Sequence, residues 1–82
     1  MPNLLPLIPG AFLAPLQYGL PSPSEATRDT ARANVQVPGL GRVGIKYRRM
    51  RHSHGRMQHW FWMPNYAEQI SPVPRRFLET DQ

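Results

Sequence analysis

The sequence predicts a small, mostly irregular and extended chain that has no independent globular core. The only regular structure expected is one short helix in the N-terminal half, a β-ribbon and a short helical turn. Ten prolines and six glycines are spread over 82 residues, which leaves few windows for a long helix or strand. A compact chain of this length also buries only about 60% of the surface that its unfolded form exposes.

The chain contains no cysteine, so neither a disulfide nor a thiolate metal site reinforces a small core. We therefore expect the isolated chain to be largely disordered and to become ordered on a larger partner. The composition divides it into four segments: residues 1–21, 22–34, 35–66 and 67–82.

Residues 1–21 are predicted to form an apolar, proline-rich extended arm. Its purely apolar part runs only from Leu4 to Leu16, which is shorter than the ~20 residues of a membrane-spanning helix. It also lacks the basic residues of a secretory signal or transit peptide. Prolines at this spacing favour polyproline II and single turns, which suit a groove on another protein. The alternative is that the arm packs back on the Trp60 cluster of its own chain. The predicted hydrophobic anchors of the arm are Leu5, Ile8, Phe12 and Leu16.

Residues 22–34 are predicted to form a short polar helix. Ser22 suits the N-cap, Pro23 suits the first helical position, and Glu25 completes a capping box. The apolar content is alanine alone, so this helix has little to bury and is expected to act as a spacer.

Residues 35–66 are predicted to be the contact segment. Alternating residues on both sides of Pro38–Gly39 indicate a β-hairpin, with a ribbon about Val43–Tyr47. Met57–Met63 is expected to make one or two helical turns, which Pro64 ends. The candidate anion- or partner-binding residues are Arg42, Lys46, Arg48, Arg49, Arg51 and Arg56. The further hydrophobic anchors are Trp60, Phe61, Trp62 and Tyr66.

Residues 67–82 are predicted to form an extended tail, with Phe77 and Leu78 as a last anchor. Neither the tail nor the rest of the chain indicates catalysis, because the sequence has no cysteine nucleophile and no paired-carboxylate motif. Three histidines lie in the basic run, but they have no acidic or cysteine neighbour that would complete a metal site. We expect no enzyme activity, cofactor, metal or small-molecule substrate.

The net charge of +5 and the pI of about 10.8 favour an anionic partner. One function that fits is a non-catalytic accessory subunit of a large mitochondrial assembly at the inner membrane, most simply a respiratory-chain complex. It would bind other protein subunits and anionic lipid headgroups. The alternative is a small mitochondrial ribosomal protein that binds rRNA through its arginine- and histidine-rich segment. The single lysine and the apolar arm favour the first function.

Overall fold

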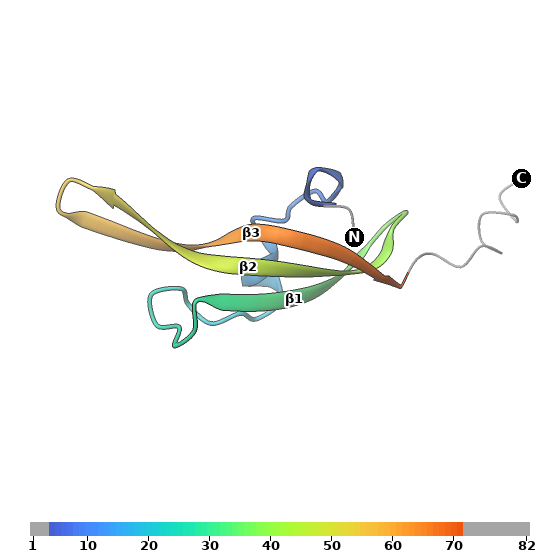
Figure 1. Cartoon of the computed structure of the whole chain (residues 1–82), viewed down its shortest axis with the longest axis horizontal. Coiled ribbons are helices and arrows are strands. Elements are labelled where there is room, and N and C mark those ends of the chain that lie inside the picture. Colours follow the sequence, from blue (N-terminus) through green and yellow to red (C-terminus); the bar gives the residue numbers. More distant parts are fainter. Residues whose placement is uncertain (1–3, 72–82) are drawn as a thin grey trace, which may run out of the picture.

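The computed structural model describes residues 4–71, which form a three-stranded antiparallel β-sheet (Figure 1). Strand β1 spans Thr30–Val37, β2 spans Gly41–His54 and β3 spans Met57–Ser71, with β2 in the centre. The 3-10 helix η1 (Leu5–Leu7) and the single-turn helix α1 (Ala14–Gln17) precede the sheet. Strands hold 54% of the described residues and helices hold 10%, so the predicted irregular fold is wrong.

The prolines do not prevent this sheet, because most of them precede β1 or lie in a turn. Among residues 4–71, only Pro64 lies within a strand. It is in the outer strand β3, beside a shift of register between Lys46 and Tyr47 of β2. Edge strands and bulges are the places where a sheet tolerates a residue that cannot donate a backbone hydrogen bond.

The helix predicted for residues 22–34 is absent, and this prediction is wrong. The backbone N–H of Glu25 donates to the Ser22 carbonyl at 3.0 Å in a single turn, and β1 begins at Thr30. Buried and exposed residues then alternate along β1, with Ala33 and Val35 buried. A helix would scatter these side chains around its axis, whereas a strand places them on one face.

The helical turn predicted at Met57–Met63 is also wrong, because these residues belong to β3. They pair with β2 in continuous register from His54–Met57 to Arg48–Met63. The reversal occurs at Gly55, whose φ of 62° is readily available only to glycine. The predicted hairpin around Pro38–Gly39 is confirmed, although its second strand is much longer than Val43–Tyr47.

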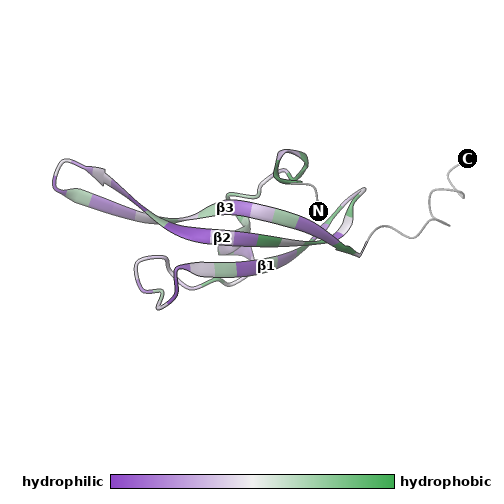
Figure 2. Cartoon of the chain, viewed as in Figure 1, coloured by the Kyte–Doolittle hydropathy of each residue, from purple (hydrophilic) through white to green (hydrophobic). Residues whose placement is uncertain are grey.

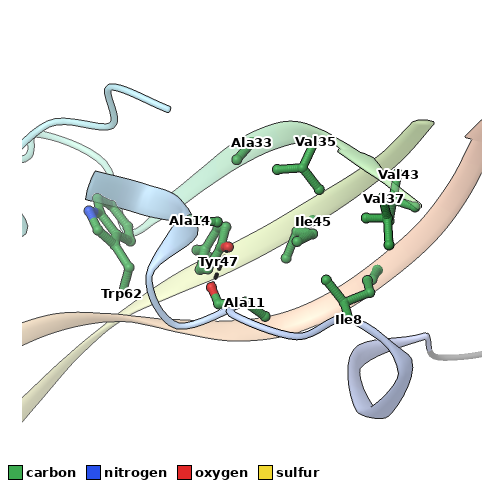
Figure 3. Close-up of a cluster of buried hydrophobic side chains, with 11 residues drawn as sticks. Ile8, Ala11, Ala14, Ala33, Val35, Val37, Val43, Ile45, Tyr47 and Trp62 are labelled. Atoms are coloured by element: carbon green, nitrogen blue, oxygen red, sulfur yellow. Dashed lines mark hydrogen bonds between the residues drawn. The ribbon is translucent and has the colours of Figure 1, made fainter. Parts of the chain in front are cut away.

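The N-terminal arm crosses one face of the sheet and supplies one side of a core (Figure 3). η1 lies against β3, and α1 lies against β1. The prediction that the chain has no core is therefore wrong. The arm packs on its own chain, as in the alternative, but mainly on side chains of β1 and β2, and Trp62 is the member of the Trp60 cluster that belongs to the core. No helix within residues 4–71 is long and apolar enough to cross a membrane. The core consists of Ile8, Ala11, Ala14, Ala33, Val35, Val37, Val43, Ile45, Tyr47, Trp62 and Ala67.

The remaining predictions for the tail lie partly outside the described residues. β3 continues past Tyr66 and ends at Ser71. The predicted anchor at Phe77 and Leu78 lies outside residues 4–71.

Candidate functional site

The sheet narrows to two strands at one end, because β1 begins opposite the middle of β2. Thr30, the first residue of β1, pairs with Arg48. Beyond that pair, residues 49–54 of β2 and 57–62 of β3 continue as a hairpin that projects past β1 (Figure 1). We call residues 49–62 the distal ribbon. Hydrophilic segments lie on both of its strands (Figure 2).

The distal ribbon and the adjoining strands carry cations that have no acidic partner among residues 4–71. No carboxylate lies in the sequence between Asp29 and Glu68. Asp29 is held by Arg49 and Glu68 by Arg32, each at 2.9 Å. The exposed cations without an ion pair in this part of the chain include five of the six predicted binding residues: Arg42, Lys46, Arg48, Arg51 and Arg56.

Arg49, the sixth predicted residue, is turned inward. Its guanidinium donates to the Ala26 carbonyl at 2.6 Å and to Asp29 Oδ1 at 2.9 Å. It also lies 4.7 Å from the centre of the Trp60 ring, and its Nε is buried without a hydrogen-bond partner. The backbone N–H of Arg49 donates to the Asp29 carbonyl at 2.7 Å. Arg49 therefore holds the segment before β1 against the base of the distal ribbon.

Because Arg49 is turned inward and Arg48 is exposed, replacing each with alanine should change the stability of the fold by different amounts. Arg49→Ala should lower the free energy of unfolding by about 1.5–3 kcal/mol, because it removes charged hydrogen bonds and leaves the Ala26 carbonyl without its donor. Arg48→Ala, at an exposed position, should stay within about 0.5 kcal/mol of the wild type. Urea denaturation of the two variants checks the prediction, and equal losses would contradict it.

The two faces of the distal ribbon differ in character. On the face continuous with the core, Arg51 lies opposite Trp60, with its guanidinium 5.5 Å from the ring centre. At this distance the guanidinium is attracted to the face of the indole ring by a cation–π interaction. On the other face, Met50 lies opposite Phe61, and His52 lies opposite His59. The first face therefore places an arginine beside a ring, whereas the second combines a ring with methionine and histidine.

The histidines of the distal ribbon are exposed and belong to its second face. His54 lies two residues after His52 on the same strand, so both share a face with His59. Within residues 4–71, no three His, Cys, Asp or Glu side chains are grouped so as to hold a metal ion. These imidazoles are available for hydrogen bonds to a partner.

The predicted hydrophobic anchors of the arm divide into buried and exposed residues. Ile8 is in the core, and Leu5 is partly buried against it. Phe12 is 68% exposed and Leu16 is 85% exposed. Only the exposed pair is free to contact a partner.

The predicted aromatic anchors also divide into a buried residue and partly exposed ones. Trp62 is buried, and its Nε1 donates to the Pro21 carbonyl at 2.9 Å. Trp60, Phe61 and Tyr66 are partly exposed, and the Lys46 ammonium lies 6.0 Å from the Tyr66 ring centre.

Tyr47 is a key residue that the sequence analysis did not single out. Its hydroxyl donates to the Ala11 carbonyl at 2.7 Å inside the core (Figure 3). Burial raises the pKa of Tyr47 from 10.0 to about 12. The alternation of Val43, Ile45 and Tyr47 in the sequence could have indicated that this ring points to the core.

A groove next to the distal ribbon also went unpredicted, because residues far apart in the sequence form it. Phe12 and Leu16 of the arm line it together with Trp60 of β3 and Pro21, and its volume is about 470 Å³. No single stretch of sequence signals such a site.

Comparison of the chain with protein-family models, with curated proteins and with solved structures found no match.

Proposed function

We propose that this chain is a non-catalytic nucleic-acid-binding protein that uses its distal ribbon as the binding element. The observation that carries the proposal is a two-stranded ribbon projecting beyond the core, with exposed arginines and no carboxylate. Within residues 4–71, the acid that forms an ion pair with it is Asp29, which is already neutralised by Arg49. A phosphate backbone supplies the counter-charge that the ribbon lacks.

The shape of the distal ribbon supports the same partner. A two-stranded antiparallel ribbon is narrow enough to follow a nucleic-acid backbone. Arg51 and Arg56 can contact phosphates, while Ser53, Gln58 and the three histidines offer hydrogen-bonding groups beside them. The rRNA of a mitochondrial ribosome, the alternative drawn from the sequence, is a partner of this kind.

The test compares two double variants of equal charge. Arg51→Gln/Arg56→Gln removes two cations from the distal ribbon, and Arg42→Gln/Lys46→Gln removes two exposed cations from the part of β2 outside it. Binding to a labelled RNA is followed by fluorescence anisotropy between about 50 and 200 mM salt. The ribbon variant should bind more weakly, and the slope of log K against log salt should fall by roughly 1.4–1.8, because about two phosphate contacts are lost.

The control variant should keep most of that slope. Equal loss in both variants would mean that net charge alone attracts RNA, and the distal ribbon would then not be the binding element. If the wild-type chain binds neither RNA nor DNA at low salt, the proposed function is wrong.

A second candidate function rests on a separate observation, the apolar side chains exposed on the arm. Leu7 is 61% exposed and Leu13 is 58% exposed, in addition to Phe12 and Leu16. Such a surface favours an accessory subunit of a membrane-associated assembly, such as a respiratory-chain complex, in which other subunits cover the arm. Fractionation separates the two functions: release from the native assembly by nuclease supports nucleic-acid binding, and release only by detergent supports the accessory subunit.

A further inference from the structure

The groove beside the distal ribbon is built from rings and prolines. It lies between the arm and β3, and its volume of about 470 Å³ falls within the ~300–1,000 Å³ of typical ligand pockets. The lining residues that matter here are Phe12, Leu16, Pro21, Pro23, Trp60 and Trp62. Phe12 and Leu16 are mostly exposed to solvent, so nothing in the described part of the chain fills this space.

Charge at the edge of the groove narrows the choice of occupant. The Arg51 guanidinium lies 5.5 Å from the centre of the Trp60 ring that lines the groove. Arg51 is exposed and has no ion pair within residues 4–71. An uncharged aliphatic occupant would use the rings and leave this cation without a counter-charge. A planar aromatic group that carries a phosphate satisfies both features.

Resting on the function proposed above, we infer that the groove takes unpaired nucleobases, so that the chain binds single-stranded nucleic acid in preference to duplex. The phosphate backbone follows the distal ribbon past Arg51 and Arg56, and bases turn from it to stack on Trp60 and Phe12. Bases in a duplex are stacked and paired with one another and cannot enter without being flipped out. A single strand offers them freely.

The polar groups near the groove indicate how strongly the site can distinguish one base from another. The Nε1 of Trp62 already donates to the Pro21 carbonyl, and the Ser22 hydroxyl shares a hydrogen bond with Ser24. The indole donor is therefore occupied, and only one of the two serine hydroxyls keeps a free hydrogen. Stacking thus carries most of the interaction. Stacking accepts every base, and binding should therefore show little sequence preference.

The experiment compares two double variants of the same arm. Phe12→Ala/Leu16→Ala removes exposed side chains that line the groove, and Leu7→Ala/Leu13→Ala removes exposed side chains that do not. Each full-length chain is titrated with a labelled oligouridine, a labelled oligoadenine and a duplex RNA at several salt concentrations between about 50 and 200 mM. Vesicles of phosphatidylserine and phosphatidylcholine are titrated in parallel. Circular dichroism checks that each variant keeps its strand content.

The wild type should bind both single strands more tightly than the duplex, and its tryptophan fluorescence should be quenched as bases stack. The groove variant should bind the single strands about tenfold more weakly with an unchanged salt slope, because it loses stacking and keeps its phosphate contacts. The control variant should match the wild type.

Other outcomes overturn the inference in distinguishable ways. Equal binding of duplex and single strand, with no effect of the groove variant, removes the nucleobase site and leaves the proposed function standing. Failure of the wild type to bind any of the three RNAs, and to bind DNA at low salt, removes both. If the groove variant loses only its binding to vesicles of phosphatidylserine and phosphatidylcholine, the groove is a lipid-contact surface and the inference is wrong.

Discussion

Replacing Ile45 with alanine should lower the free energy of unfolding by about 2–5 kcal/mol. Ile45 lies in the central strand β2 and is 0% exposed, with the arm on one side and the flanking strands beside it. The lost methyl groups leave a cavity that a sheet paired on both sides cannot close. A chain of 82 residues has a total stability of only about 4–12 kcal/mol, so the substitution removes a large fraction of it. The midpoint of thermal unfolding should fall by about 4–8 °C for each kcal/mol lost.

Ile70→Ala is the matched control, because it makes the same chemical change at a site in β3 that is 44% exposed. Ile70→Ala should lower the free energy of unfolding by less than about 1 kcal/mol. Thermal unfolding followed by circular dichroism measures both variants. Equal, small effects would contradict the prediction, because they would show that the arm does not cover the sheet in solution.

Raising the pH above 10 should destabilise the fold through Tyr47. Burial raises the pKa of Tyr47 from 10.0 to about 12, so the folded chain keeps the phenol proton at pH values where the unfolded chain has lost it. The contribution of the protonated Tyr47 to the free energy of unfolding is fully present below pH 10 and is lost as the pH rises towards 12. The loss is about 1.36 kcal/mol per pH unit over this window, or about 2–3 kcal/mol in total.

Tyr47→Phe provides the comparison for this prediction. At neutral pH it should lower the free energy of unfolding by about 1–3 kcal/mol, because the buried Ala11 carbonyl loses its donor. Above pH 10, however, its stability should fall less steeply than that of the wild type. Urea denaturation at several pH values measures both effects, and parallel pH profiles for the two proteins would show that Tyr47 does not titrate inside the core.

Features that depend on neighbouring residues could be predicted from the sequence. Pro38–Gly39 marked the hairpin between β1 and β2, since turn conformations are set by the residues in the turn. The basic run also indicated a charged surface correctly, because no carboxylate lies near enough in the chain to neutralise it. Five of its six predicted binding residues are exposed and free of ion pairs within residues 4–71.

Tertiary structure alone decided which segments became strands and which arginine turned inward. The capping signals at Ser22–Glu25 are worth only about 1 kcal/mol, whereas pairing Thr30–Val37 with β2 buries alternate side chains against the arm. Burial of several apolar side chains at about 1.5–3 kcal/mol each outweighs the helix signal. Arg49 and Arg48 are adjacent and chemically identical, yet the pleat of β2 directs one to Asp29 and the other to solvent. The sequence carries no local sign of that difference, because the partner of Arg49 lies twenty residues away and meets it only when the sheet has formed.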